Sequence, residues 1–387
     1  MISQRAQQVG ASEIRKMFNM VQGRTDVLNM TVGQPDFDTP KHIKEAAKKA
    51  IDDGITKYTH NAGLIEVREA MSGKLKRENG IIADPATEII MTAGGMGSLL
   101  LANLVLVNPG DEVIYPDPGF VSHLAHVQMA GGVPVPVQLK SENGFGMMAK
   151  DVERLITPKT KLLVVNSPNN PTGGVTAKAE LRKMADLAKT HGFYVLCDNA
   201  YEKFRYDGEK SFDIGSMPGM KERCLTLCSF SKSYSMTGWR IGFCTGPKEI
   251  IAAMTKLQEH VLSMPTSISQ KAAEAAVNGP QDCVKEMIDT FRKRRDLITK
   301  GLNAIDGVKM DPPSGAFYAF PDVSAYGRKS YDLAIDILKN TGVVLVHGSG
   351  FGRYGEGFLR LCYAVSTETI EEAMSRMDSY LPKLLKK

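Results

Sequence analysis

The sequence has few cysteines, and their placement suits neither a metal site nor a disulfide framework. Six cysteines occur in 387 residues, and no two of them form a CxxC pair. Most lie inside apolar runs, where a free thiol behaves as a small hydrophobic side chain. Zinc sites and disulfide scaffolds need paired or closely spaced cysteines. We therefore expect no metal, buried free thiols, and a reducing, cytoplasmic location.

Long apolar segments and tracts of one charge are also missing. No stretch reaches the roughly 18 uninterrupted apolar residues of a membrane-spanning helix, and the N-terminal stretch lacks the apolar core of a secretory signal. The net charge of +5 comes from 48 basic and 43 acidic residues, with no basic stripe interleaved with aromatic residues. We therefore expect neither a membrane nor a nucleic acid as a partner. The slight basic excess suits a small anionic ligand.

Two common phosphate-binding motifs are absent, although one glycine-rich loop is present. The chain has neither a Walker sequence, which ends in Gly-Lys-Ser/Thr, nor a GxGxxG followed by an acidic partner, so a dehydrogenase is disfavoured. The loop TAGGMGS at 92–98 follows an apolar run and opens a helical one. Backbone amides at such a turn can hold a phosphate, although glycines there often serve packing alone.

Apolar runs alternate with helical segments through most of the chain. With 43% hydrophobic and 24% charged residues, the composition is that of a globular protein. Short runs rich in branched apolar residues, such as KLLVVN at 161–166 and CLTLC at 224–228, are separated by segments with helical periodicity. Strands buried on both faces and separated by helices indicate an α/β fold with a mainly parallel sheet flanked by helices.

The pattern changes near residue 286. A long charged helix begins there and is followed by short apolar strands, which suggests a smaller α+β domain. A chain of this length is expected to hold more than one core. We predict an N-terminal segment (1–45) that packs with the small domain, a large domain (46–285) and a small C-terminal domain (286–387).

Polar side chains follow the predicted strands at their carboxyl ends, where open α/β sheets bind ligands. Each alone has a structural explanation, as a turn former, a strand cap, a packing residue or a surface ion pair. Together they offer an amine, a carboxylate, hydrogen-bonding groups and an anion site on successive strands. They are Asn170, Asp198, Tyr201, Ser229, Lys232 and Arg240.

One cofactor needs this whole set, namely pyridoxal 5′-phosphate. Its aldehyde combines with a lysine amine, and its pyridine nitrogen needs a carboxylate to stay protonated. Its phosphate needs hydroxyl groups, backbone amides and an arginine. The sequence therefore predicts a site for this cofactor around Lys232.

The stretch SFSKSYSMTGWRIG at 229–242 resembles the lysine signature of class I/II aminotransferases, which are pyridoxal-phosphate enzymes of fold type I. The likeness runs nearly end to end and is greatest to the aspartate and aromatic aminotransferases of bacteria and archaea. Six further blocks are similar to family blocks in the same order. They are VGQPDFDTP, KYTHNAGLIEVREAM, NSPNNPTGG, DNAYEKFRYDG, SGAFYAFP and LRLCYA.

The resemblance implies a role for each matched residue. Lys232 would combine with the cofactor aldehyde and transfer the substrate proton, Asp198 would pair with the pyridine nitrogen, and Tyr201 would complete the catalytic group. Asn170 would join Tyr201 at the phenolic oxygen, with Phe120 stacked on the ring. The implied phosphate contacts are Ser229, Ser231, Arg240 and the amides of Gly95 and Met96.

The resemblance also implies contacts to the substrate and to a second subunit. Gly33 and Arg360, with Asn170 beside them, would hold the substrate α-carboxylate. Tyr58 matches a tyrosine that reaches the phosphate of the neighbouring subunit, so a homodimer with shared active sites is expected.

The implied reaction is ping-pong transfer of an amino group from an L-amino acid to a 2-oxo acid such as 2-oxoglutarate. A β- or γ-eliminating lyase of the same fold is the main alternative, because it would share the lysine, the aspartate and the carboxylate clamp. A non-catalytic sensor with an aminotransferase-like domain is a remote one, because such proteins usually carry a helix-turn-helix domain that we do not expect here.

Two positions depart from the family pattern. Asn199 follows Asp198 where many relatives have glutamate, which changes the local charge. Met96 stands where aspartate-specific bacterial relatives tend to have a lysine for the side-chain carboxylate of the substrate. Either the donor is aromatic or broadly apolar, or another basic residue binds that carboxylate, and the sequence leaves both open.

Overall fold

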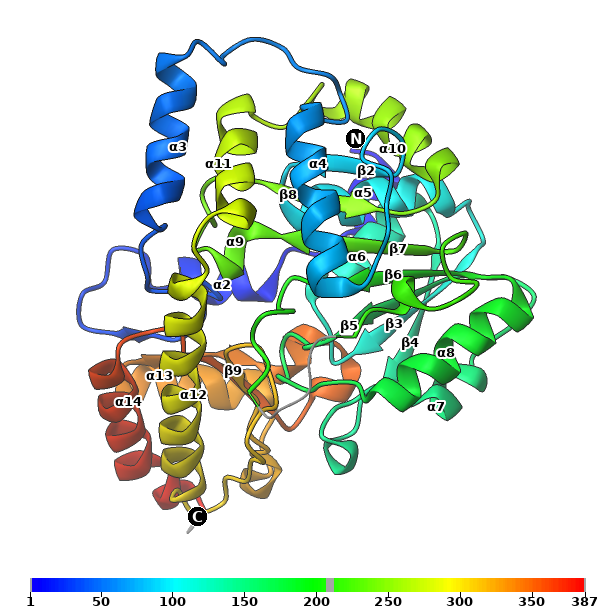
Figure 1. The fold of residues 1–387 in the computed structure, drawn as a ribbon. Coiled ribbons are helices and arrows are strands. Elements are labelled where there is room, and N and C mark those ends of the chain that lie inside the picture. The colour runs from blue at the N-terminus through cyan, green and yellow to red at the C-terminus, as the bar shows by residue number, and fades with distance from the viewer. Residues whose placement is uncertain (1, 207–211, 386–387) are drawn as a thin grey trace.

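A seven-stranded sheet lies at the centre of the larger part of the chain (Figure 1). The computed structural model describes residues 2–206 and 212–385. Neighbouring strands run parallel apart from β8, which is antiparallel to both of its neighbours. In order across the sheet the strands are β2 (Ile89–Thr92), β8 (Gly242–Thr245), β7 (Cys224–Ser229), β6 (Tyr194–Asp198), β5 (Thr160–Asn166), β3 (Glu112–Asp117) and β4 (Val133–Gln138). The predicted α/β fold with a mainly parallel sheet is confirmed.

Helices cover both faces of this sheet. Alternate residues of β5 enter opposite cores, with Leu162 and Val164 on one face and Leu163 and Val165 on the other. This double burial explains why the strand is an unbroken apolar run in the sequence. The covering helices are α5 (Gly94–Leu106), α6 (Val121–Ala130) and α10 (Lys248–Val261) on one face, and α7 (Ala149–Glu153) and α8 (Lys178–His191) on the other.

Three further helices pack together beside the β2 edge of the sheet (Figure 1). They are α3 (Lys41–Asp52), α4 (Ile65–Lys74) and α11 (Ser267–Asn278). A π-helical turn, η1 (Leu75–Asn79), extends α4 and ends at Gly80, whose φ of 70° is left-handed. Glycine accepts that conformation without strain, so the predicted stop at Gly80 has a clear physical reason.

The C-terminal part surrounds a small antiparallel sheet of order β11 (Val346–His347), β12 (Leu359–Cys362) and β9 (Tyr318–Ala319). The N-terminal segment joins it, because β1 (Leu28–Asn29) pairs in parallel with β10 (Val343–Val344). The helices of the C-terminal part are α12 (Asp282–Asn303), α13 (Ser330–Thr341) and α14 (Thr367–Tyr380). The predicted boundary between residues 285 and 286 falls inside α12, and the three-part division of the chain stays a prediction.

Asp207 and Gly208, which end the block DNAYEKFRYDG, lie outside the described residues.

The remaining elements are short. The other α-helices are α1 (Gln4–Gln8), α2 (Glu13–Asn19) and α9 (Phe230–Ser233). The 3₁₀ turns are η2 (Ser141–Asn143), η3 (Ile214–Ser216), η4 (Ser324–Tyr326), η5 (Gly348–Phe351), η6 (Arg353–Gly355) and η7 (Leu381–Leu384).

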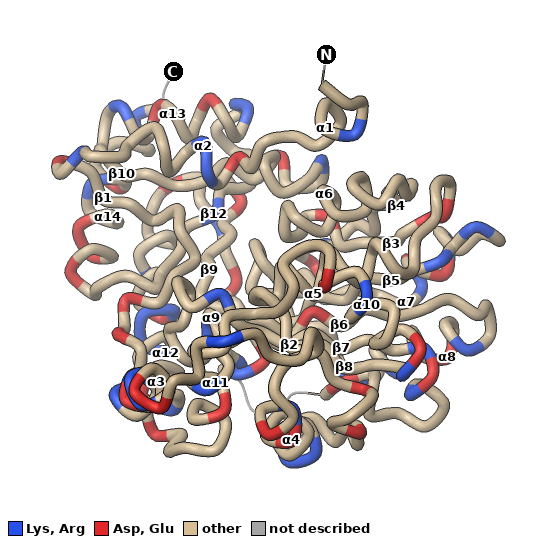
Figure 2. The backbone as a smooth tube through the Cα atoms, turned by 90° about the horizontal axis from the view of Figure 1, so that it is seen from above, with Lys and Arg blue, Asp and Glu red and all other residues tan. Residues whose placement is uncertain are grey.

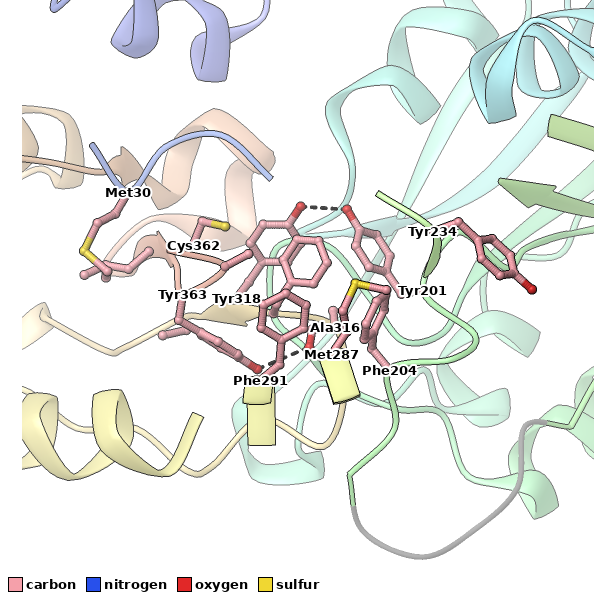
Figure 3. Packing of buried hydrophobic residues seen from close by; sticks show 14 of the residues in the cluster. Met30, Tyr201, Phe204, Tyr234, Met287, Phe291, Ala316, Tyr318, Cys362 and Tyr363 are labelled. Atoms are coloured by element: carbon pink, nitrogen blue, oxygen red, sulfur yellow. Dashed lines mark hydrogen bonds between the residues drawn. The ribbon is translucent and has the colours of Figure 1, made fainter. Parts of the chain in front are cut away.

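A cluster of buried aromatic rings joins the two parts of the chain (Figure 3). Phe317, beside β9, makes edge contacts with Tyr201 and Phe204, which follow β6, at ring-centroid distances of 5.4 Å. Phe291 of α12 packs against Phe317 at 5.3 Å. Aromatic pairs of this kind bury large areas and prefer tilted or edge-on geometry. The cluster therefore holds Tyr201 and its neighbour Tyr318 in place.

Charged residues of both signs are mixed along the outer helices. Figure 2 shows basic and acidic residues interspersed on α3 and α8. On α3, Lys49 pairs with Asp53 at 2.8 Å, and on α8, Lys183 pairs with Glu180 at 2.6 Å. Across residues 2–206 and 212–385, no helix combines the length and apolar character that crossing a membrane requires.

Candidate active site

A cavity of about 400 Å³ opens at the carboxyl ends of β5, β6 and β7. Every residue that the sequence predicts for the site lines this cavity except Tyr58. They are Gly33, Gly95, Met96, Phe120, Asn170, Asp198, Tyr201, Ser229, Ser231, Lys232, Arg240 and Arg360. The fold thus gathers side chains from separate strands and from both parts of the chain.

Lys232 lies in α9, directly after β7. Ser229 begins this short helix, and its Oγ accepts a hydrogen bond from Ser231 N at 3.3 Å. The Lys232 ammonium donates a hydrogen bond to the backbone carbonyl of Gly33. Burial lowers the pKa of Lys232 to about 8, and the guanidinium groups of Arg240 and Arg360 act in the same direction. A substantial fraction of this amine is therefore neutral near pH 8, as a nucleophile or base must be.

Asp198 ends β6 and is held by a histidine that the sequence did not point to. Its Oδ2 lies 3.0 Å from His123 Nε2, and its Oδ1 accepts a hydrogen bond from Ala200 N at 3.1 Å. Both side chains are buried. His123 comes from α6, three residues after Phe120, and its contact with Asp198, 75 positions away, could not be recognised from the local sequence. The contact orients the carboxylate toward the cavity.

Arg360 on β12 is only 1% exposed and is fixed on several sides. It donates hydrogen bonds to Asn170 Oδ1 at 3.1 Å and to the carbonyl of Thr31. Its guanidinium carbon lies 4.6 Å from the ring centre of Tyr318. Among the described residues, its buried Nε has no hydrogen-bond partner. A rigid cation with an unpaired donor can bind a carboxylate.

Two tyrosines of the cavity lining form a hydrogen bond between their hydroxyl groups. The Tyr201 and Tyr318 hydroxyls lie 2.6 Å apart and point toward each other (Figure 3). Burial raises the pKa of Tyr201 well above its usual value, so the phenol stays neutral. A Cβ on Gly33 would collide with the Tyr318 hydroxyl, which explains the glycine at that position. Tyr318 was missed individually, although it lies in the block SGAFYAFP.

Another group of residues in the cavity lining suits an anion. Helix α5 starts at Gly94, so the amides of Gly95 and Met96 lie in its first turn. Arg240 extends over Gly94, where a Cβ would lie 2.9 Å from the guanidinium Nη2. Free amides and the helix dipole favour negative charge at a helix start. With the hydroxyls of Ser229 and Ser231 in the same lining, this group suits a phosphate.

The family description "Aminotransferase class I and II" matches residues 25–377 of the chain. The chain belongs to this family. It is 42% identical to an aromatic-amino-acid aminotransferase of Thermococcus litoralis and 42% identical to an aspartate aminotransferase of Pyrococcus abyssi, with 98% of both chains covered in each case. A solved structure of Thermus thermophilus aspartate aminotransferase with maleate superposes with a TM-score of 0.92 at 40% identity, covering 98% of this chain and 99% of that one.

The protein is thus an aminotransferase of fold type I that moves amino groups between amino acids and 2-oxo acids. Its cofactor is pyridoxal 5′-phosphate, and the side chains in the cavity fit that group. The amine, the carboxylate and the residues suited to an anion lie in one lining. Arg360 adds a guanidinium group to the same lining.

Tyr58 is the predicted residue that this aminotransferase does not bring to its own cavity. Its side chain is 89% exposed, and it does not line the pocket. The predicted contact with a neighbouring subunit stays a prediction.

Asn199 is turned toward a buried network outside the cavity lining of the aminotransferase. Its Nδ2 donates a hydrogen bond to Asp213 Oδ2 at 2.6 Å, and Asp213 also accepts one from Thr226 Oγ1 at 2.9 Å. A glutamate at 199 would place a second carboxylate against Asp213, which like-charge repulsion disfavours. An asparagine at position 199, in place of the glutamate of many relatives, therefore fits its hydrogen-bond partner Asp213.

We expect the Lys232 amine of the cofactor-free aminotransferase to react at unusually low pH. Below about pH 8 the buried amine is protonated and unreactive, and above it the amine is neutral. An exposed lysine reaches that state only near its usual pKa of about 10.4. Modification by a small amine-selective reagent, followed by peptide mass spectrometry, should rise with a midpoint near 8 for Lys232. Exposed Lys293 is the internal control, and a Lys232 midpoint equal to that of Lys293 would contradict the expectation.

Proposed function

We propose that this aminotransferase takes the amino group of aspartate or of an aromatic L-amino acid and passes it to a 2-oxo acid such as 2-oxoglutarate. The observation that carries the proposal is the convergence of Lys232, Asp198 and Arg360 in one cavity with residues suited to an anion. The names of the two relatives at 42% identity, one aromatic and one aspartate aminotransferase, support this range of donors.

The proposed cofactor contacts come from residues of the cavity lining. Pyridoxal phosphate supplies, when bound, a reactive aldehyde and a protonated pyridine ring that withdraws electrons from the substrate Cα. Asp198, oriented by His123, would keep the ring nitrogen protonated. Asn170 and Tyr201 would donate to the phenolic oxygen, with Phe120 against the ring. Ser229, Ser231, Arg240 and the amides of Gly95 and Met96 would hold the phosphate.

Lys232 is the proposed proton carrier. Its Nζ lies in the cavity lining, where burial lowers its pKa to about 8, so it can accept the substrate Cα proton and donate it again. The carbonyl of Gly33 accepts a hydrogen bond from this Nζ and positions it.

Arg360 is the proposed orienting residue for the substrate. Its guanidinium is held by Asn170 and Thr31, so a bound α-carboxylate would take one fixed orientation. That orientation decides which bond at the substrate Cα breaks, because only a bond held in the reactive geometry breaks readily. A fixed carboxylate therefore favours loss of the Cα proton over decarboxylation.

Met96 leads us to expect that tyrosine or phenylalanine has a kcat/KM at least comparable to that of aspartate. Its thioether is 38% exposed at the cavity and cannot pair with a carboxylate, whereas it can contact an aromatic ring. The purified enzyme should be assayed with alanine, aspartate, tyrosine and cystine, following both 2-oxo-acid amination and ammonia release. A strong preference for aspartate would contradict this role for Met96. Ammonia release without amination would favour the lyase alternative.

The dimer and the cytoplasmic location are parts of the same proposal. The tyrosine at position 58, 89% exposed, fits the proposed dimer, because aromatic residues are enriched at subunit interfaces. Sedimentation equilibrium of the purified protein decides between a monomer and a dimer. The six free cysteines, five of them buried, support a reducing compartment.

A further inference from the structure

The cavity contains one cation that the proposed reaction does not use. Among the described residues, four cationic side chains line it, namely Arg15, Lys232, Arg240 and Arg360. The last three have proposed roles at the Cα proton, the cofactor phosphate and the α-carboxylate. Arg15 comes from α2, in the N-terminal segment, and has none.

Helix α2 is anchored, so the fold fixes the backbone at Arg15, whose exposed side chain extends at the cavity lining. Ser12 begins the helix and its Oγ accepts a hydrogen bond from the Arg15 backbone N at 3.5 Å. Met17 is fully buried on the inner face. Glu13 Oε2 lies 3.3 Å from His347 Nε2, which connects the helix to the C-terminal part.

The charge of Arg15 is uncompensated, unlike that of its neighbour. Lys16 pairs with Glu13 at 2.6 Å. No carboxylate of residues 2–206 or 212–385 makes an ion pair with Arg15, whose nearest aromatic contact is Phe18 at 5.9 Å. A guanidinium that lines a cavity and has no ion-pair partner among the described residues is available for an anionic ligand.

The surrounding wall is apolar. Ile14, Val32, Met96 and Leu99 line the cavity with Arg15. Such a wall accepts an aromatic side chain, and the long Arg15 side chain can then stay in solvent. A side-chain carboxylate, in contrast, needs a cation, and Met96 cannot supply one.

We propose that Arg15 binds the side-chain carboxylate of dicarboxylic substrates, such as aspartate and 2-oxoglutarate. One cavity thus serves two substrate classes, with Arg15 used by dicarboxylates and the apolar wall by aromatic side chains. The inference rests on the proposed function and names the residue that sets its substrate range.

The test compares Arg15→Gln and Arg15→Lys with the matched control Lys16→Gln, which removes the adjacent positive charge of the same helix. Half-reactions with aspartate and with phenylalanine are followed separately by cofactor absorbance in stopped flow. Binding of two unreactive acids, succinate and 3-phenylpropionate, is measured by calorimetry. The binding arm reports on Arg15 without relying on catalysis.

We expect Arg15→Gln to lower kcat/KM for aspartate, and the affinity for succinate, by roughly 10- to 100-fold, the effect of a lost charge-assisted hydrogen bond. Phenylalanine turnover and 3-phenylpropionate binding should change less than about threefold on the same reasoning. Arg15→Lys should recover part of the loss, and Lys16→Gln should behave as wild type.

Equal losses for both classes, unchanged succinate affinity, no recovery in Arg15→Lys or an equal effect of Lys16→Gln would each overturn the assignment. A wild-type enzyme that transfers no amino group from any donor would instead overturn the proposed function. The succinate measurement still tests Arg15 in that case.

Discussion

Replacing Lys232 with alanine is expected to lower kcat by roughly 10²- to 10⁴-fold, the usual contribution of a positioned general base, and further if covalent binding of the cofactor is also lost. Lys232 is the lysine that lines the cavity, and burial has already lowered its pKa to about 8. Among the described residues, no other lysine lines the cavity, so no other lysine is placed to take the Cα proton. Single-turnover kinetics with saturating cofactor measures the effect on the chemical step.

Two controls separate catalysis from folding in this experiment. Lys293→Ala removes an exposed lysine of α12 and should leave kcat unchanged. Small primary amines such as methylamine should restore part of the activity of Lys232→Ala, because they replace the missing base in a cavity of about 400 Å³. Borohydride reduction of the wild type should fix the cofactor to Lys232. Label on a different lysine, or a variant of nearly full activity, would refute the assignment.

The fold could be predicted to a large extent because its signals are local. A continuous apolar run such as KLLVVN indicates a strand that is buried on both faces. The run can be recognised without knowing which elements cover the strand. The ligand end of the sheet followed from the same runs, since Asp198 and Ser229 stand where β6 and β7 end. The sequence predicts a start of α12 near residue 286, whereas the helix begins at Asp282, an acidic residue favoured in the first turn of a helix.

The missed residues share a different physical origin. His123 meets Asp198 across 75 positions of sequence, and Tyr318 meets Tyr201 across 117 positions. Such contacts depend on how α6 packs on the sheet and on how β9 approaches the loop after β6. Arg15 belongs to the same class, because a helix near the N-terminus reaches the cavity only through its contacts with the C-terminal part. Local patterns carry no information on these approaches.

The two departures from the family pattern also needed the structure. Asn199 is explained by Asp213, a buried carboxylate fourteen positions later that requires a donor. For Met96 the sequence allows two interpretations. Either the amino donor is aromatic or broadly apolar, or another basic residue binds the side-chain carboxylate of the substrate. With Arg15 in the same lining, the two possibilities cease to exclude each other. Under this proposal, the substrate range depends on two residues of the same cavity lining, Met96 and Arg15.

Replacing Arg360 with lysine is expected to lower kcat/KM for every amino acid by roughly 30-fold to several thousandfold, which corresponds to the 2–5 kcal/mol lost when one partner of a buried charged pair is removed. A lysine ammonium has no fork of donors, so it cannot hold Asn170, Thr31 and a carboxylate in one plane. Arg360→Ala should in addition lower the free energy of unfolding by about 1–3 kcal/mol, because it leaves the Asn170 and Thr31 oxygens unpaired.

The sharpest readout for Arg360 is discrimination between a substrate with and without its α-carboxylate. Phenylalanine and phenylethylamine differ only in that group, so the ratio of their kcat/KM values isolates the interaction from any general damage to the site. Arg360→Lys should reduce the ratio, mainly through the phenylalanine value, whereas Arg353→Lys, outside the cavity lining, should leave it unchanged. If both values fell together and the ratio held, Arg360 would be a structural residue, and the α-carboxylate would have to be bound elsewhere in the cavity.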